Sequence, residues 1–282
     1  MTNLGADTVW PLWADTVGGD AFTVQDVAAP PEQAVVTAVA APVLLGFAPA
    51  VPNGRAMLVL GGGGYVALMA GREGVQVARW LTGLGYHAFV LIHRFPEAAT
   101  GPSAPLDDAR EAMRRIRVRG LAPDGLGVVG LSSGGHLAAC LAAEYPAEWT
   151  EPPSPRAALP TRPDVLVVGY GPLSTNAKGR TLLPDKPPLP PAEKQAMYDR
   201  LQPDTQLLPG PPPMFIVYSG NDPVVPVENA LRLYGAVRGA GGVADLHIFG
   251  DAPHGFALDT PGLPVSAWPE LCEAWLRQVG FL

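Results

Sequence analysis

The feature that most constrains this chain is the regular alternation of short, apolar, β-branched runs with segments whose apolar residues recur at helical spacing. Between two of these runs, for example, Val77, Trp80, Leu81 and Leu84 share one helical face. Strands that alternate with single helices are joined by right-handed crossovers and form a mostly parallel sheet with helices on both faces. We therefore predict a single, doubly wound α/β domain over residues 1–282. The predicted strands are residues 34–40, 55–60, 87–93, 126–130, 164–169, 214–219 and 244–249.

Two regions depart from this alternation. Residues 1–50 indicate an antiparallel entry to the sheet. Residues 171–213 are dense in proline and contain one short helical piece at about 192–201. Long insertions in compact domains are often binding loops, so this segment is interpreted either as a surface connection or as a small lid over a binding site. A last helix is predicted at about 267–279.

Composition argues against several classes of partner. The formal net charge is −7 and the sequence pI is about 5.2, so no basic stripe is available for nucleic acid or for an anionic membrane surface. Cys140 and Cys272 lie far apart, which gives neither a disulfide framework nor metal-ligand spacing. The N-terminal residues lack the pattern of a secretory signal. We expect a soluble, cytoplasmic protein, and the sequence does not indicate an oligomeric state.

The segment VVGLSSGGHLAA contains a candidate nucleophile. Gly130-Leu131-Ser132-Ser133-Gly134 fits the pattern G-x-S-x-G with Ser132 at its centre, whereas a frame centred on Ser133 places Leu131 where a glycine is needed. The motif follows a β-branched run and opens a helical segment, which is the context of a serine nucleophile on a tight strand-to-helix turn. The alternative is an ordinary glycine-rich turn.

A serine hydroxyl needs a base, usually a histidine that is held by a carboxylate. His254 is the predicted base because Pro253 and Gly255 place it in a loop just beyond a strand. His136, one turn after Ser132 on the same helix, is interpreted as a packed residue. The other histidines bracket a strand or lie inside one: His87, His93 and His247.

Asp222 is the predicted acid. It stands at the end of the strand MFIVYS, and Pro223 holds it in extended geometry outside the following helix. Enzymes with this serine motif place the acid between the serine and the histidine in chain order. Asp204 and Asp251 are competitors, but neither follows a strand directly. The carboxyl ends of parallel strands form one edge of a sheet, where open α/β folds bind ligands.

Four consecutive glycines, Gly61 to Gly64, follow the strand MLVLG and precede Tyr65. A glycine-rich loop at this place can aim backbone N–H groups at the oxygen of a bound carbonyl, and no G-K-[ST] follows that would indicate a phosphate loop. The N–H groups of Gly63, Gly64 and Ser133 are the predicted oxyanion hole. Tyr65 is a candidate substrate contact, with a packed aromatic side chain as the alternative.

Four segments together carry a family resemblance: GGGYVALMAGREGVQVARWLTGLGYHAFVL, VVGLSSGGHLAA, YSGNDPVVPVENALRLYGAVRGAG and APHGFAL. From about Arg55 to the C-terminus, the chain resembles the esterase/lipase branch of the α/β-hydrolases that contains the carbohydrate acetyl-esterases. The resemblance implies an α/β-hydrolase fold and an esterase that deacetylates sugars such as xylan oligosaccharides. Gly61, where relatives commonly carry proline or histidine, and the proline-rich insertion depart from the family pattern and leave acyl and alcohol specificity open.

The predicted activity is acyl transfer to water, with Ser132 as nucleophile, His254 as base, Asp222 as orienting acid and no metal or organic cofactor. The expected partner is a small-molecule ester, with acetylated sugars as one candidate. Two alternatives stay open. One is a serine peptidase or amidase, of the prolyl-oligopeptidase or aryl formamidase kind, and the other is a non-catalytic receptor on the same scaffold.

Overall fold

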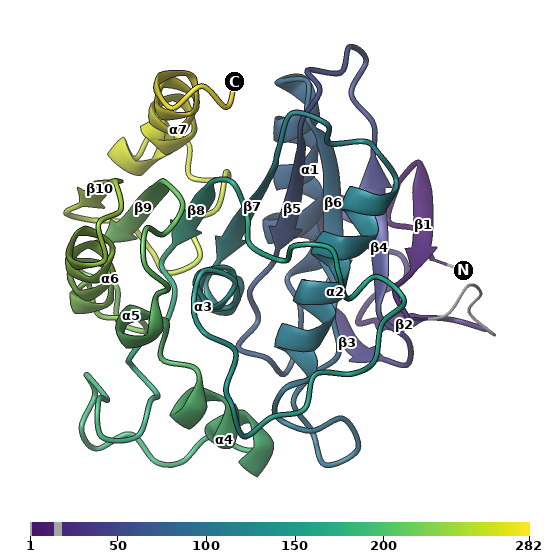
Figure 1. Cartoon of the computed structure of the whole chain (residues 1–282). Coiled ribbons are helices and arrows are strands. Elements are labelled where there is room, and N and C mark those ends of the chain that lie inside the picture. The colour runs from purple at the N-terminus through teal and green to yellow at the C-terminus, as the bar shows by residue number, and fades with distance from the viewer. Residues whose placement is uncertain (1, 14–18) are drawn as a thin grey trace.

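The computed structural model describes residues 2–13 and 19–282. Its main sheet has eight strands in the order β1-β4-β6-β5-β7-β8-β9-β10 (Figure 1). Six neighbouring strands of the sheet run parallel to one another: β6, β5, β7, β8, β9 and β10. Strand β4 is antiparallel to both β1 and β6. The strand bounds are β1 Thr8–Pro11, β4 Val43–Phe47, β5 Ala56–Leu60, β6 His87–Ile92, β7 Leu126–Leu131, β8 Leu166–Gly169, β9 Met214–Ser219 and β10 Ala244–Phe249. The predicted mostly parallel α/β sheet is confirmed.

The N-terminal part differs from the prediction in detail. The predicted strand at 34–40 forms as β3 (Val36–Val39), but it pairs with β2 (Phe22–Val24) in a separate antiparallel ribbon rather than in the main sheet. The N-terminal strands that enter the main sheet are β1 and β4, and the prediction omitted both. Pro42 separates β3 from β4 within one long apolar stretch, and hydropathy alone does not divide such a stretch into two strands.

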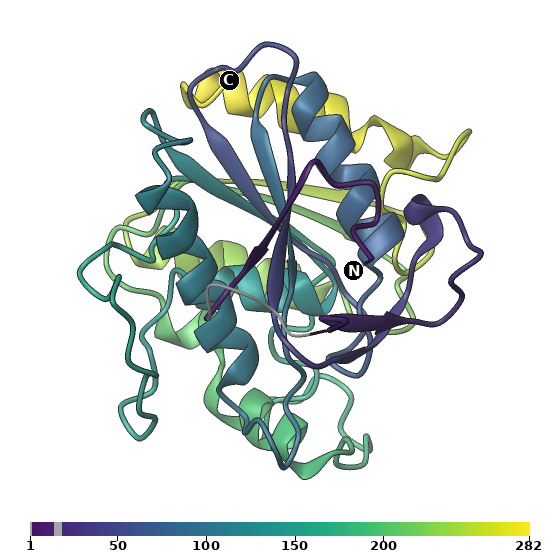
Figure 2. The same cartoon turned by 90° about the vertical axis from the view of Figure 1, so that its right-hand side faces the viewer.

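Helices cover both faces of the sheet. On one face lie α1 (Gln76–Gly83) and α7 (Trp268–Gln278), and on the other lie α2 (Ala104–Val118), α3 (Ser133–Cys140) and α6 (Glu228–Gly239) (Figure 2). The last helix was predicted within one residue at each end. No helix in the part of the chain that the structure describes combines the length and the apolar character needed to cross a bilayer.

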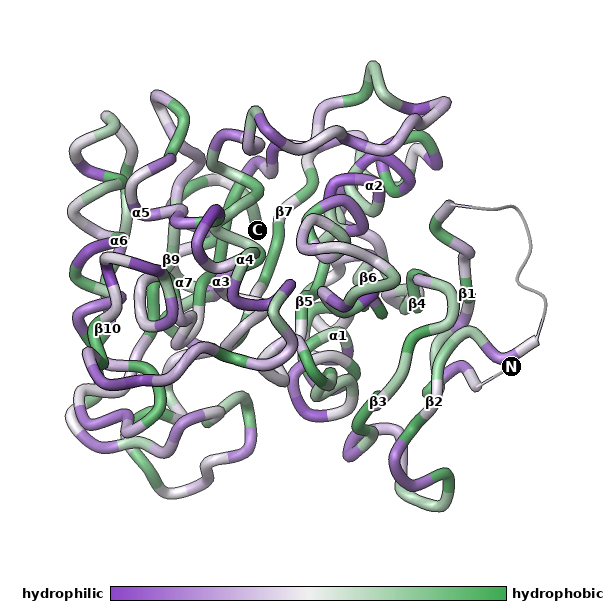
Figure 3. The backbone as a smooth tube through the Cα atoms, turned by 90° about the horizontal axis from the view of Figure 1, so that it is seen from below, coloured by the Kyte–Doolittle hydropathy of each residue, from purple (hydrophilic) through white to green (hydrophobic). Residues whose placement is uncertain are grey.

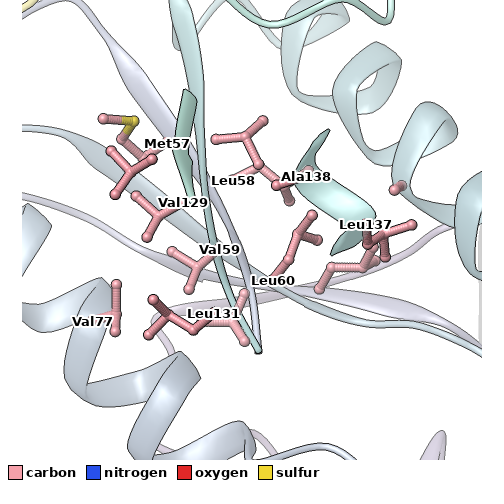
Figure 4. Close-up of a cluster of buried hydrophobic side chains, with 14 of the residues drawn as sticks. Met57, Leu58, Val59, Leu60, Val77, Val129, Leu131, Leu137 and Ala138 are labelled. Atoms are coloured by element: carbon pink, nitrogen blue, oxygen red, sulfur yellow. The ribbon is translucent and has the colours of Figure 1, made fainter. Parts of the chain in front are cut away.

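The core lies on both sides of the central strands. Every residue of β5 is buried, and its side chains alternate between the two faces. Met57 and Val59 point toward α1, whereas Leu58 and Leu60 point toward α3 (Figure 4). Seen from below, the tube is green along β5 and β7 (Figure 3). Full burial of each such side chain contributes about 1.5–3 kcal/mol, which fixes the central strands and therefore the loops at their ends.

The proline-rich insertion lies at the carboxyl edge of the sheet. It contains α4 (Ala192–Arg200), which matches the helical piece expected at 192–201, and α5 (Pro203–Gln206). Figure 1 shows α4 beneath the ends toward which the arrowheads of β5, β7 and β8 point. Parallel strands bring their carboxyl ends to one edge, so the insertion faces the loops that carry the predicted site residues.

Candidate active site

Ser132 lies on a sharp turn between β7 and α3. Its backbone has φ 53° and ψ −124°, a conformation that costs a non-glycine residue about 1–3 kcal/mol and that often marks a functional site. The flanking glycines make the turn possible. A Cβ on Gly130 would lie 2.1 Å from the carbonyl oxygen of Gly134, and one on Gly134 would lie 2.0 Å from that of Leu60. No larger residue fits at either position.

The structure brings Ser132, His254 and Asp222 together. Ser132 Oγ lies 3.0 Å from His254 Nε2, and His254 Nδ1 lies 2.7 Å from Asp222 Oδ2. An ionised carboxylate can only accept hydrogen bonds, so Nδ1 carries the proton and Nε2 is free to accept one from the serine. The Asp222 side chain is fully buried, and its Oδ1 accepts the N–H groups of Val224 at 2.8 Å and Val225 at 2.9 Å. These bonds fix the carboxylate in place.

The competing acids and bases lie elsewhere. Asp204 pairs with Arg180 and accepts the Ser174 hydroxyl at 3.0 Å. Asp251 accepts the side-chain amide of Asn221 at 2.7 Å. His136 is buried in α3, where its Nε2 donates to the carbonyl of Leu201 at 2.9 Å. Each of these groups already has a structural partner away from Ser132 Oγ.

Tyr65 is fully buried, and its hydroxyl donates to His136 Nδ1 at 2.8 Å. Its ring packs edge-on against Tyr198 of α4. The side chain therefore matches the packed-aromatic alternative rather than the substrate contact that was also considered. Tyr65 ties the loop of residues 61–64, the predicted oxyanion loop, to α3 and α4.

His136 predicts a pH dependence of stability. Burial lowers the pKa of His136 from 6.5 to about 4, so between these values the unfolded chain takes up a proton that the folded protein does not. The free energy of unfolding should then fall as pH drops from 6.5 to 4, by up to about 3 kcal/mol from this residue. His136→Gln keeps a donor for Leu201 and an acceptor for Tyr65 but cannot titrate. Urea unfolding of both proteins at several pH values checks this, and parallel pH profiles would contradict it.

The glycine loop after β5 lies against the nucleophile. A Cβ on Gly62 would come within 2.6 Å of Ser132 Cβ. Gly63 has φ 127°, and a Cβ there would lie 2.3 Å from the carbonyl oxygen of Ala67. Within the described residues, the N–H groups of Gly63 and Ser133 donate no hydrogen bond, whereas the N–H of Gly64 donates to Ser133 Oγ at 3.0 Å. Two of the three predicted oxyanion donors are thus free for a substrate oxygen, and the third is held by Ser133.

Glu73 is a buried carboxylate beside the site that the sequence did not reveal. It belongs to a π-helical segment, η2 (Ala70–Val75). Its Oε2 accepts the N–H of Gly62 at 2.6 Å, and its Oε1 accepts the hydroxyl of Tyr170 at 3.0 Å. The Tyr170 hydroxyl in turn accepts the N–H of Ala257 at 3.2 Å, and its ring packs edge-on against His254. Burial raises the pKa of Glu73, and the hydrogen bonds from Gly62 and Tyr170 oppose that rise. Through Tyr170, Glu73 therefore links the predicted oxyanion loop to the loop that carries His254.

Glu73→Gln should lower kcat for p-nitrophenyl acetate about tenfold, less than the 10²–10³-fold that follows loss of an oxyanion donor itself. A glutamine offers one acceptor oxygen, which cannot serve Gly62 and Tyr170 together, so the loop loses its fixed position. Because Glu73 does not touch the substrate, KM should change much less than kcat. Steady-state kinetics and thermal melting, with Glu228→Gln as an exposed control, check this. An equal change in kcat for both variants would rule out the positioning role.

Comparison with known proteins places this geometry in a family. A family model described as alpha/beta hydrolase fold matches residues 58–258. The chain is 28% identical over 231 residues to an acetylxylan esterase of Xylanibacter ruminicola, an alignment that covers 76% of this chain and 43% of that protein. It is 31% identical over 193 residues to an endo-1,4-beta-xylanase B of Butyrivibrio fibrisolvens, covering 64% of this chain and 29% of that protein. The chain thus spans less than half the length of these curated relatives.

Solved structures agree with the family model. An acetyl ester-xyloside bifunctional hydrolase from Caldicellulosiruptor lactoaceticus superposes with a TM-score of 0.73 at 28% identity, and the match covers 98% of both chains. An esterase from Thermogutta terrifontis superposes with a TM-score of 0.68 at 23% identity, covering 93% of this chain and 95% of that one, which is a likeness of fold. The resemblance inferred from the four sequence segments is confirmed. Because the family model spans most of its length, this chain belongs to the alpha/beta hydrolase fold family.

Proposed function

We propose that the protein is a serine carboxylic-ester hydrolase that acts through an acyl-enzyme on short-acyl esters, above all acetyl esters. The observation that carries the proposal is the continuous hydrogen-bonded chain from Ser132 Oγ through His254 to Asp222. A serine that is strained on a turn, bonded to a histidine and faced by free backbone N–H groups has the parts that nucleophilic acyl transfer needs.

In the first half of the reaction, Ser132 Oγ attacks the ester carbonyl while its proton moves to His254 Nε2. Asp222 stabilises the imidazolium through its bond to Nδ1. The carbonyl oxygen becomes an oxyanion, which accepts the N–H groups of Gly63 and Ser133. Gly64 adds a third donor if its N–H leaves Ser133 Oγ. Collapse of the intermediate releases the alcohol, which takes the proton from Nε2.

In the second half, water attacks the acyl-enzyme. His254 Nε2 removes a proton from the water, and the same N–H groups bind the second oxyanion. Collapse breaks the bond to Ser132 Oγ, which recovers its proton from the imidazolium, and the carboxylic acid leaves. Each step uses side chains of this chain and needs no metal or organic cofactor.

The names of the relatives support the substrate class. One relative is an acetylxylan esterase and a structural neighbour is an acetyl ester-xyloside hydrolase, so acetylated xylo-oligosaccharides are the first natural substrates to test. We further propose that residues 171–213 act as a lid, which is supported by the position of α4 at the carboxyl edge of the sheet. We also propose a cytoplasmic location, where the two free, buried cysteines, Cys140 and Cys272, would stay reduced.

A substrate comparison tests the proposal. Release of acetate from acetylated xylo-oligosaccharides and hydrolysis of a p-nitrophenyl ester series should exceed cleavage of aminoacyl-proline amides and formyl-kynurenine. Faster cleavage of the amides would make the protein a peptidase or amidase. A folded sample that hydrolyses none of these substrates and is not labelled by a fluorophosphonate would be a receptor instead.

A further inference from the structure

Lys194 of α4 has a nearly buried side chain. Its exposure is 9%, although lysine is rarely buried unless it is paired. Within the part of the chain that the structure describes, Lys194 Nζ makes no hydrogen bond and no ion pair. The stem of this side chain is therefore held by packing, while its ammonium is unpaired and available to a negatively charged ligand.

The position of Lys194 is fixed by its neighbour one helical turn later. Lys194 and Tyr198 are four residues apart and therefore lie on the same face of α4. The Tyr198 ring packs on Tyr65 at 5.7 Å and on His136 at 4.9 Å between ring centroids. This contact places Lys194 over the oxyanion loop, where its Nζ lies 3.7 Å from the point that a Cβ on Gly64 would occupy.

A second cation lies near the first. Burial lowers the pKa of Lys186 and of Lys194, and the charge of Lys186 lowers the pKa of Lys194 further. Lys186 lines a cavity of about 350 Å³ within the insertion and another of about 530 Å³ that reaches Pro223 and Val224, directly after the catalytic acid. In a protein with a net charge of −7, two lysines thus gather where the insertion meets the predicted site.

We propose that Lys194, assisted by Lys186, binds a carboxylate carried by the ester substrate, so that the enzyme prefers anionic esters to neutral ones. A carboxylate supplies both the missing negative charge and the acceptors for the ammonium N–H groups. A neutral sugar hydroxyl would supply an acceptor but would leave the charge unpaired. This inference rests on the proposed function in that the ligand is taken to be an ester, and it adds a substrate class that the names of the relatives do not contain.

Two matched substrate pairs test the preference. The first pair carries the carboxylate on the alcohol side and compares anionic p-acetoxybenzoate with its neutral methyl ester. In the other pair the carboxylate is on the acyl side, in mono-p-nitrophenyl adipate against p-nitrophenyl hexanoate. The readout is the ratio of kcat/KM for the anionic ester to that for the neutral ester. In Lys194→Met this ratio should fall about 10- to 100-fold in at least one pair, the range expected for a lost charge-assisted hydrogen bond.

The control is Arg200→Met, which removes an exposed cation of the same helix, α4, and should leave both ratios within about twofold, as expected when solvent and salt screen an exposed charge. Lys194→Arg should retain most of the preference. Ratios that stay unchanged in both pairs overturn the proposal. If kcat/KM falls equally for anionic and neutral esters, the ratios do not change, and Lys194 would act on the oxyanion instead. Lys194→Gln replaces Lys194→Met if the latter does not fold.

Calorimetry separates this inference from the proposed function. In a Ser132→Ala background, which cannot form an acyl-enzyme, p-acetoxybenzoate should bind more tightly than its methyl ester, and Lys194→Met should abolish the difference. Carboxylate binding through Lys194 without turnover of any ester by the unmodified protein would retain the inference and overturn the hydrolase. Turnover of neutral esters with no response to Lys194→Met in kinetics or calorimetry would do the reverse.

Discussion

Ser132→Ala should lower kcat for p-nitrophenyl acetate by about 10³-fold or more, as nucleophile substitutions do in serine hydrolases. Without Oγ the acyl-enzyme cannot form, because among the described residues the group that hydrogen-bonds His254 Nε2 is this hydroxyl, at 3.0 Å. Residual hydrolysis would come from water and the oxyanion N–H groups. Initial rates, together with loss of fluorophosphonate labelling, measure the effect.

The matched variant is Ser133→Ala, which removes the neighbouring hydroxyl but keeps the backbone N–H. Ser133 Oγ accepts the N–H of Gly64, so this change should shift the rate modestly and leave the labelling stoichiometry intact. Undiminished activity in Ser132→Ala, or loss of labelling in Ser133→Ala alone, would move the nucleophile to Ser133. The pair of variants thus tests the reading frame of the serine motif.

The three residues of the hydrogen-bonded chain could be predicted from the sequence because each one is marked by local chemistry. Gly130 and Gly134 permit the strained turn at Ser132, and Pro223 and Gly255 hold Asp222 and His254 in loops just beyond strands. Strand ends in a parallel sheet meet at one edge, so loop position in the sequence translated directly into proximity in space. The sequence could not predict which backbone carbonyl and amide groups each of these side chains hydrogen-bonds, because those contacts depend on how the loops pack.

Glu73 could not be predicted in the same way. Its segment, AGREGV, gives no periodic signal, because it forms a π-helical turn instead of extending α1, and such turns have no sequence rule comparable to helical spacing. The pairing of Glu73 with Gly62 depends on tertiary contacts. Lys194 was missed for a related reason, since a lysine in a polar helix normally indicates a solvated face and only the packing of Tyr198 shows otherwise.

The N-terminal region shows a different limit. The sequence indicated antiparallel pairing there, and both the β2–β3 ribbon and the β1–β4 pair are antiparallel. Burial of both faces marks the strand that lies inside the main sheet: β4, between β1 and β6, is buried at every position, whereas β3 is exposed at two. Strands with one exposed face pair at the periphery, and the length of an apolar run does not distinguish such a strand from an interior one.

Asp222→Asn should lower kcat for p-nitrophenyl acetate by about 10⁴-fold, the scale found when the acid of a serine triad becomes an amide. Asn can keep its oxygen toward the N–H groups of Val224 and Val225, but its NH₂ then faces His254 Nδ1. The imidazole must present a lone pair there, so its proton moves to Nε2, where it can no longer accept the proton of Ser132.

The control for this prediction is Asp251→Asn. Asp251 lies in the loop between β10 and His254, and its carboxylate accepts an exposed hydrogen bond from the side chain of Asn221. This variant should keep kcat within about threefold, as surface substitutions away from a site usually do. The two proteins should melt at similar temperatures, because asparagine preserves the shape of the Asp222 site. Comparable activity in both variants would mean that the acid is not Asp222, and the hydrogen bond between His254 Nδ1 and Asp222 Oδ2 would then be structural. A collapse of activity in Asp222→Asn with normal melting would instead establish that the acid acts by fixing the histidine tautomer, since size, burial and two of its three hydrogen bonds are retained.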